Sequence, residues 1–298
     1  MIQRKGEGMY HGMAMFVVAV WGVTYISTKV LLSNGLTPAE IMFLRFLMAY
    51  AAIWFVAPKK LRADNWRDEG LFLLLGLFGG SFYFQTENMA LRDTLASNVA
   101  LILCTAPLLT ALLSHFFVRG ERLRRNIVWG SLCALSGVAL VIFNGHFILK
   151  LSPKGDLLCL LSALSWAIYT LLLRKVNGRY STLFITRKVF FYGLLTLLPV
   201  FFFVPPTVEW GVLLRPAVAG NLLFLGLVAS LLCYILWNGV VKRLGGVRAN
   251  NYIYASPLVT LVASAIVLHE RITWVAILGA VLIIGGVYLA GRKGVSSR

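Results

Sequence analysis

The chain has 298 residues, of which 59% are hydrophobic and 13% are charged, and its formal net charge is +17. Soluble domains contain roughly 45–50% apolar and about 25% charged residues, so a water-soluble core of this length has no room for so much apolar surface. Most of that surface must therefore face lipid. The basic residues are spread over short loops and form no single patch, which argues against a nucleic-acid partner.

Ten apolar runs are each close to the ~20 residues that a membrane-spanning helix requires. They cover residues 9–32, 38–57, 70–90, 96–118, 126–145, 155–174, 181–204, 217–241, 249–268 and 272–291. The segments between them are short and contain no linker or soluble domain. The sequence thus predicts an all-α integral membrane protein with ten transmembrane helices.

The distribution of Lys and Arg sets the expected orientation. With the N-terminus inside the cell, the inner segments hold 19 of the 28 basic residues and the outer loops hold five. The remaining four lie within predicted spans, namely Lys29, Arg45, Arg187 and Lys188. We therefore expect a multi-pass protein of the plasma membrane, the inner membrane of a bacterium, with both termini cytoplasmic.

One pattern occurs twice, in residues 98–140 and 248–289. In each copy an apolar run with one proline, Pro107 or Pro257, is followed by a charged Glu-Arg turn. A second apolar run then follows, with two glycines seven residues apart. Self-similarity of this kind indicates a duplicated structural unit.

The duplication has a geometric consequence for the fold. Each half, residues 1–148 and residues 149–298, contains five predicted crossings, so the second half starts from the opposite side of the membrane. Many secondary transporters are built from such inverted repeats, with the substrate site near the bilayer midplane between them. The expected architecture is two inverted five-helix repeats around a central cavity that takes a small-molecule substrate.

Several motifs resemble those of the EamA group of the drug/metabolite transporter superfamily. They are an early Trp21-Gly22 with Lys29, Asn98 and Ala106-Pro107 ahead of Glu121, and Ala255-Ser256-Pro257 ahead of His269-Glu270. The resemblance covers essentially the whole chain. It implies a basket in which helices 1–4 and 6–9 surround a central cavity while helices 5 and 10 lie at the periphery. It also implies export of small metabolites, prominently amino acids, without ATP, in agreement with the absence of a P-loop motif from the sequence.

Charged side chains inside a span cost at least ~2.5–3.5 kcal/mol on insertion scales, so each needs a partner or a wet cavity. Arg45 lies in the second predicted helix, and Lys188 takes the matching place in the seventh when Thr37 is aligned with Tyr180. These two cations either face the cavity, where they can bind a carboxylate, or pair with helix-end carbonyls. Glu87 is the only acid deep within a span. It either carries a coupling proton or forms an ion pair with Arg45 or Lys188.

Amides and aromatic rings supply the other candidates for substrate binding. Asn88 and Asn238 occupy equivalent places in the third and eighth helices, where they either contact substrate or hydrogen-bond neighbouring helices. The mid-span aromatic residues favour an amphipathic cavity for a zwitterion with an apolar side chain, and ring faces can contact its ammonium group. The candidate substrate-binding residues are Trp21, Arg45, Tyr83, Asn88, Trp166, Lys188, Tyr234, Trp237, Asn238 and Tyr254.

Pro107 and Pro257 fall in the middle of the fourth and ninth predicted helices, where each removes a backbone hydrogen bond and kinks the helix. The kinks are either hinges for a rocking motion or fixed bends needed for packing. The paired glycines are expected to allow close helix approach. The four cysteines stand singly in apolar runs, and His115 and His269 have no acidic or cysteine partner at ligand spacing. We therefore expect no metal site, cofactor or catalytic residue.

Three functional classes follow from these features. The favoured one is a secondary exporter of small amino-acid-like metabolites, coupled to protons or to the membrane potential. Within transport, the alternative is efflux of organic cations or drugs, which requires an accessible acid unopposed by positive charge. In this chain Glu87 is the single acid deep within a span, and up to four basic residues within the spans oppose its charge. Outside transport, the alternative is an intramembrane enzyme or sensor, but the spans contain no serine-histidine or metal constellation and no paired aspartates.

Overall fold

The computed structural model describes residues 7–57, 60–94, 96–118, 121, 123–143, 152–259, 262 and 273–291. Every regular element in these residues is a helix, and none is a strand. The all-α class predicted from the sequence is therefore confirmed.

The helices of the first half are α1 (Glu7–Ser33), α2 (Pro38–Ile53), α3 (Trp66–Gly76), η2 (Leu77–Ser81), α4 (Phe82–Asp93), α5 (Ala96–Leu103), α6 (Ala106–Phe117) and α7 (Arg125–Phe143). Those of the second half are α8 (Pro153–Val176), α9 (Thr182–Leu197), α10 (Val200–Phe203), α11 (Trp210–Leu213), α12 (Pro216–Leu223), η3 (Phe224–Leu232), α13 (Cys233–Leu244), α14 (Gly246–Asn250), η4 (Asn251–Ala255) and α16 (Trp274–Gly291). The π-helical elements η2 and η3 join α3 to α4 and α12 to α13 without a break.

Six helical segments in the described part of the chain are long and apolar enough to cross a membrane. They are Glu7–Ser33, Asn98–Phe117, Arg125–Ile142, Pro153–Val176, Thr182–Phe203 and Pro216–Leu244. Helix α2 has 16 residues, and the apolar stretch Trp274–Ala290 is also short. The predicted span 249–268 lies partly outside the described residues. The count of ten crossings therefore stays a prediction, while a bundle with several helices of sufficient length and apolar composition to span a membrane is observed.

Helices of the two halves pack against one another in matched pairs. Helix α4 packs on α8, and α1 packs on α13. Likewise, α3 packs on α9, and η3 packs on α2. In terms of the predicted spans, the third contacts the sixth and seventh, while the eighth contacts the first and second. Each span of one half takes the place of its counterpart in the other half: the third corresponds to the eighth, the sixth to the first and the seventh to the second. The two sets of contacts are therefore equivalent.

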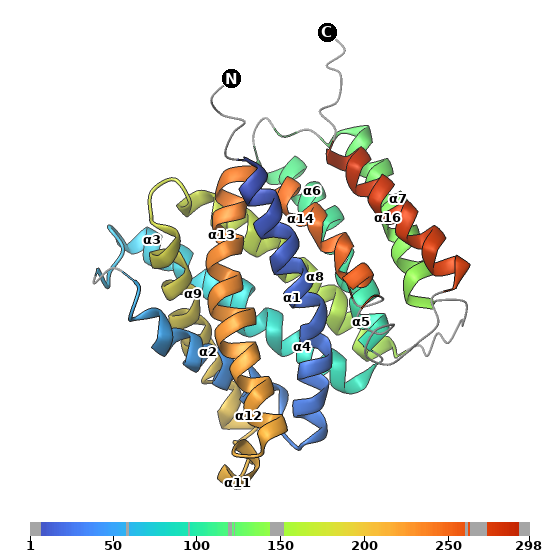
Figure 1. Ribbon diagram of the computed structural model, residues 1–298. Coiled ribbons are helices and arrows are strands. Elements are labelled where there is room, and N and C mark those ends of the chain that lie inside the picture. The colour runs from blue at the N-terminus through green and yellow to red at the C-terminus, as the bar shows by residue number, and fades with distance from the viewer. Residues whose placement is uncertain are drawn as a thin grey trace.

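Helices α7 and α16 pack mainly on each other, as a pair at one edge of the bundle, and also contact α5, α6 and η4 (Figure 1). A Cβ atom on Gly137 would lie 2.5 Å from the carbonyl oxygen of Gly279, and one on Gly130 would lie 2.6 Å from that of Gly286. Only glycine permits this contact, because real Cβ atoms do not come so close to a carbonyl oxygen. The predicted close approach of the glycine faces is confirmed.

Two helix N-termini show how local sequence sets the register. Thr37 caps α2 with a capping box, in which its Oγ1 accepts a hydrogen bond from the Glu40 N–H at 3.3 Å and Glu40 Oε2 accepts one from the Thr37 N–H at 2.7 Å. Ser181 caps α9, and its Oγ accepts from the Phe184 N–H at 3.3 Å. The structural equivalent of Thr37 is therefore Ser181, one residue after Tyr180.

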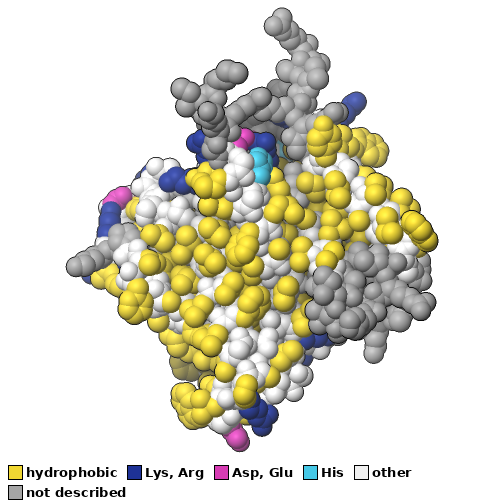
Figure 2. Space-filling model, in the orientation of Figure 1, with side chains coloured by type: hydrophobic (Ala, Val, Ile, Leu, Met, Phe, Trp, Pro, Cys, Tyr) yellow, Lys and Arg dark blue, Asp and Glu magenta, His cyan; other side chains and the backbone are white. Residues whose placement is uncertain are grey.

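The start of α1 and the end of α16 lie at the same end of the molecule, which we call the terminal end (Figure 1). Hydrophobic side chains cover most of the face drawn in Figure 2, and the coloured charged residues lie mainly near its margins. A surface of this kind fits a lipid environment, with the charged margins at the level of water and head groups.

Asp68 ties α3 to the segment between α8 and α9 outside the predicted spans. Its Oδ2 accepts hydrogen bonds from Tyr180 Oη at 2.6 Å and Arg179 Nη1 at 2.7 Å. These two donors, Tyr180 first, lower the pKa of the Asp68 carboxyl from its usual value. Burial, together with the bond to Asp68, raises the pKa of Tyr180 to about 12.

Candidate functional site

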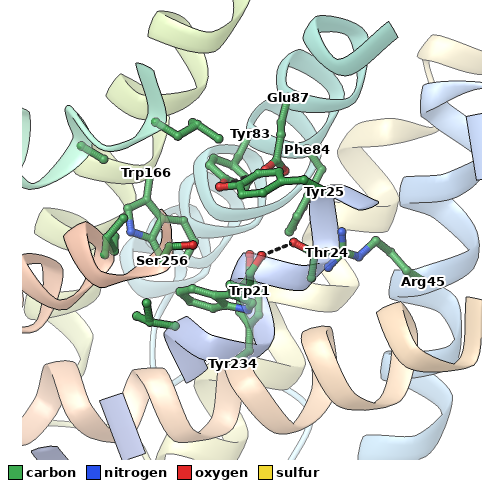
Figure 3. A pocket seen from close by; sticks show the side chains of 14 residues that line it. Trp21, Thr24, Tyr25, Arg45, Tyr83, Phe84, Glu87, Trp166, Tyr234 and Ser256 are labelled. Carbon is green, nitrogen blue, oxygen red and sulfur yellow. Dashed lines mark hydrogen bonds between the residues drawn. The ribbon is translucent and has the colours of Figure 1, made fainter. Parts of the chain in front are cut away.

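One cavity lies among helices of both halves, and we call it the central cavity (Figure 3). It encloses about 600 Å³ of empty space, including the part that opens outward. Helices α1, α2, α4, α5 and α6 contribute side chains from the first half, and α8, α13 and the segment around η4 contribute from the second. The lining residues are Val18, Trp21, Thr24, Tyr25, Arg45, Tyr83, Phe84, Glu87, Leu103, Ala106, Trp166, Tyr234, Ile253 and Ser256.

The predicted candidates divide into two groups by their position relative to this cavity. Six of them line it: Trp21, Arg45, Tyr83, Glu87, Trp166 and Tyr234. The other substrate-binding candidates do not line it: Asn88, Lys188, Trp237, Asn238 and Tyr254.

Aromatic rings form one wall of the central cavity. The Trp21 and Trp166 rings meet edge to face with centroids 5.2 Å apart, and the Tyr83 ring lies 5.2 Å from Trp166. Trp237 stands behind this wall, with its ring centroid 5.0 Å from that of Trp21. The Tyr234 hydroxyl donates to the carbonyl of Gly79 across the two halves. These contacts fix the ring positions and leave an apolar, polarisable surface toward the cavity.

Glu87 and Arg45 line the same cavity without a direct ion pair between them (Figure 3). Glu87 Oε1 accepts a long hydrogen bond of 3.4 Å from the Tyr83 hydroxyl. Arg45 Nε donates to Ser230 Oγ at 2.9 Å, and the guanidinium lies 4.1 Å from the centroid of the Phe84 ring. Both residues are almost fully buried, at 6% and 2% exposed. The cavity therefore holds one acid and one base that are each positioned by neutral neighbours.

Lys188 lies elsewhere, in a groove beside α3. Its Nζ is 2.7 Å from Glu69 Oε1, and Glu69 also accepts from the Tyr192 hydroxyl. The cationic pair expected from the sequence is therefore not assembled in the central cavity. Because Ser181 is the equivalent of Thr37, the residue opposite Arg45 is Val189. Lys188 is one position off, which turns it by about 100° around the helix.

The two candidate asparagines bond protein groups. Asn88 Nδ2 donates to the Pro38 carbonyl at 3.2 Å. Asn238 Nδ2 donates to Thr186 Oγ1 at 2.9 Å, and Asn238 Oδ1 accepts from the Tyr169 hydroxyl at 2.7 Å. Both asparagines hold neighbouring helices together, which is one of the two roles considered from the sequence.

A buried polar cluster around Asn250 adjoins the central cavity. Asn250 Oδ1 accepts from the Trp166 indole N–H at 3.2 Å, and its Nδ2 lies 2.6 Å from Thr110 Oγ1 and 3.2 Å from Thr170 Oγ1. Thr110 lies one turn beyond the cavity-lining Ala106 on α6, whose far end reaches the terminal end (Figure 1). The cluster therefore joins α6, α8 and α14 between the cavity and the terminal end.

Both predicted kink sites are interruptions of helix geometry beside the cavity. Helix α5 ends at Leu103, and Pro107 lies in the first turn of α6, which Thr105 precedes as N-cap residue. In the second half, the 3₁₀-helical η4 ends directly before Ser256 and Pro257. Leu103 and Ala106 line the cavity at the first interruption, and Ile253 and Ser256 line it at the second.

Several lining residues were not among the sequence candidates. Thr24 and Tyr25 follow Trp21 at the i+3 and i+4 positions of α1, and Val18 precedes it at i−3. Helical spacing from Trp21 was the signal that could have identified them. Phe84 lines the cavity as the ring beneath Arg45. The described residues contain no group of three or more His, Cys, Asp or Glu side chains that could hold a metal ion.

The structure has the form of a membrane transporter. It is a multi-pass helical bundle, and the buried cavity between its halves contains both an acid and a base. The chain belongs to the EamA-like transporter family, whose profile matches residues 9–143 and 153–292. Membership confirms the family suggested by the sequence motifs and identifies the protein as a transporter, not an enzyme.

Individual relatives agree over nearly the full length. The chain is 30% identical over 289 residues to a probable amino-acid metabolite efflux pump of Escherichia coli (strain K12), covering 93% of each protein. It is 27% identical over 287 residues to a probable terminal-alkyne amino-acid exporter of Streptantibioticus cattleyicolor, covering 95% of this chain and 94% of that protein. A solved crystal structure superposes with a TM-score of 0.74 at 20% identity, covering 95% of this chain and 97% of that one, which shows a shared fold.

Proposed function

We propose that this transporter exports small amphipathic metabolites, amino acids foremost, by alternating access of the central cavity. The proposed architecture is ten transmembrane helices in two inverted repeats, residues 1–148 and 149–298. The matched packing of α4 on α8 and α1 on α13 supports it, as do the equivalent π-helical elements η2 and η3. The two family matches fall on either side of the proposed division.

The observation that carries the substrate class is the presence of Glu87 and Arg45 in one cavity without an ion pair between them. An amino acid carries an ammonium and a carboxylate, so it can neutralise both groups at once. Arg45 suits the carboxylate because its guanidinium offers several N–H donors, of which Nε is bound to Ser230. The rings of Trp21 and Trp166 provide an apolar surface for the side chain of the substrate.

Helix α6 adds to the recognition of a carboxylate. It begins at Ala106 in the cavity wall, after the interruption that follows α5. The N-terminus of a helix carries a partial positive charge, and discontinuous helices in transporters direct such ends toward anionic substrate groups. The relatives named as amino-acid exporters point to the same substrate class.

The proposed cycle assigns further roles within the bundle. Glu87 exchanges a coupling proton, and Pro107 and Pro257 mark the hinges about which the halves rock. In this proposal the protein lies in the plasma membrane, with both termini in the cytoplasm. With this orientation, the Asn250 cluster closes the cavity toward the cytoplasm.

The substrate class is tested by efflux from proteoliposomes loaded with phenylalanine, its methyl ester or phenethylamine. We expect phenylalanine to be transported best, because only it offers both charges to Glu87 and Arg45. The Arg45→Met variant should slow phenylalanine far more than the two compounds without a carboxylate. If the wild type prefers phenethylamine and the ester, and Arg45→Met leaves the phenylalanine rate unchanged, the protein is an organic-cation exporter instead.

A further inference from the structure

A second groove, separate from the central cavity, lies where the C-terminal end of α2 meets the segment 60–66 and α9. It encloses about 1200 Å³ of empty space, including the part that opens outward, and shares no lining residue with the central cavity. Its lining residues include Trp54, Arg62, Trp66, Arg187, Lys188 and Phe191. We call this the lateral groove.

The side chains of the lateral groove carry more positive than negative charge. Three cations, Arg62, Arg187 and Lys188, line it together with two carboxylates, Asp64 and Glu69. Lys188 is neutralised by Glu69 at 2.7 Å. Asp64 forms an ion pair with Lys60, which is not among the lining residues. The groove therefore retains a net positive charge that attracts an anion.

The two arginines are held in different ways. Arg187 is 2% exposed, its Nη2 donates to the Lys60 carbonyl, and its guanidinium lies 4.9 Å from the centroid of the Trp54 ring. Arg62 lies in the exposed segment at the mouth of the groove. A carbonyl and a ring orient a guanidinium without removing its charge. The wall of the groove thus offers one fixed and one adaptable arginine.

Large aromatic side chains around the groove are exposed. Trp66 is 85% exposed, and Trp54 and Phe191 are about half as exposed. In a membrane protein, exposed tryptophans next to arginines mark the level of the lipid head groups. At that level the most concentrated anion is a phospholipid phosphate, and basic pockets between transmembrane helices bind such head groups.

We propose that the lateral groove binds an anionic phospholipid, with its phosphate between Arg62 and Arg187. Arginine suits a phosphate because its planar guanidinium can donate two parallel hydrogen bonds. The Trp54 and Trp66 rings then contact the glycerol region, and Phe191 contacts the start of an acyl chain. This site is independent of the transport cavity and of the substrate that the cavity takes.

The test compares thermal stability in nanodiscs of phosphatidylcholine alone with nanodiscs that also contain phosphatidylglycerol. Native mass spectrometry counts the phosphatidylglycerol molecules retained by the protein. We expect phosphatidylglycerol to raise the melting temperature and one molecule to be retained. Arg62→Gln and Arg187→Gln should each remove most of that rise, whereas Arg215→Gln, which removes an exposed arginine before α12, should keep it.

Two outcomes would overturn the proposal. One is a full rise and a retained lipid in Arg62→Gln, a variant that alters only an exposed side chain and so leaves the fold intact even if Arg187→Gln does not fold. The other is an equal rise with water-soluble glycerol phosphate added to phosphatidylcholine nanodiscs, because the ligand would then be a soluble phosphate. Transport is not measured, so neither outcome depends on the proposed substrate.

Discussion

Lys188 and Glu69 form an ion pair, with Nζ 2.7 Å from Oε1 and 2.9 Å from Oε2, and Tyr192 donates its hydroxyl to the same carboxylate. This pair lies in the lateral groove, whereas Arg45 lies in the central cavity. The two cations that look equivalent in the sequence therefore have different surroundings and are expected to respond differently to substitution.

The Lys188→Met variant should lower stability without changing substrate preference. Removing one partner of a buried ion pair typically costs about 3–5 kcal/mol, because it leaves a buried charge without compensation. We expect a clearly lower melting temperature and an unchanged ratio of phenylalanine to phenethylamine transport. The double variant Lys188→Met/Glu69→Gln should recover part of the lost stability. A change in the transport ratio of the single variant would instead place Lys188 in the substrate path.

The Glu87→Gln variant should abolish transport driven by a proton gradient. A glutamine keeps the shape of the side chain and its contact with Tyr83 but cannot release a proton. We expect gradient-driven uptake of phenylalanine into inverted vesicles to stop, while exchange of phenylalanine across the membrane without a gradient continues. Glu87→Asp serves as the control and should retain gradient-driven uptake at a reduced rate. Unchanged uptake in Glu87→Gln at normal expression would remove this residue from coupling.

Adjacent glycines in α16 provide a matched test of helix packing. A Cβ atom on Gly286 would lie 2.5 Å from the carbonyl oxygen of Gly130, whereas nothing lies within 4 Å of one on Gly285. Gly286→Val should therefore force α7 and α16 apart and destabilise the protein by about 1–3 kcal/mol, the usual cost of overpacking. Gly285→Val should be tolerated. Similar melting temperatures for the two variants would contradict the close packing of these helices.

The sequence predicted the helical class, the family and most of the cavity-lining aromatic residues, because hydrophobic runs and duplicated motifs are local signals. It placed Lys188 opposite Arg45 because Thr37 was aligned with Tyr180. The capping hydrogen bond that identifies Ser181 as the true equivalent depends on the start of α9 in three dimensions. A shift of one residue is enough to move a side chain to another face of a helix.

Tyr254 shows a second limit of sequence patterns. It follows Asn250 by four residues, a spacing that places two side chains on one face of an α-helix. The chain between them is the 3₁₀-helical η4, which has about three residues per turn, so the two side chains diverge. Tyr254 consequently packs in a buried cluster with Ala134 and Ile283, away from the cavity. Pro257 indicated a kink in this helix, but it did not indicate that the turn before it is 3₁₀-helical.

The folded protein should become less stable in acid because Asp68 becomes protonated. The pKa of this carboxyl is lowered in the folded protein by Tyr180 and Arg179, so its ionised form stabilises the fold at pH values above about 3.9, the usual pKa of an unfolded aspartate. That contribution is lost as the pH falls through the folded pKa. We lower the pH from 6 to values below the folded pKa of Asp68 and measure the melting temperature. We expect it to drop more in the wild type than in Asp68→Asn, which lacks the titrating group. If the melting temperatures of the wild type and Asp68→Asn fall in parallel with pH, Asp68 does not contribute to the loss of stability in acid.

The Asn250 cluster should bias which side of the cavity is closed. Its amide joins Trp166, Thr110 and Thr170, and each buried interhelical hydrogen bond in a membrane protein is worth about 0.6 kcal/mol and at most about 1.7 kcal/mol. Asn250→Ala removes all three contacts and should raise the population open toward the terminal end several-fold. The measurement is labelling of the cavity-lining variant Ala106→Cys from that end with an impermeant thiol reagent, after the four native cysteines have been replaced. Asn221→Ala, which removes an exposed amide bonded only within its own helix, is the control and should leave labelling unchanged. Equal labelling of Asn250→Ala and the control would show that this cluster does not hold the cavity closed.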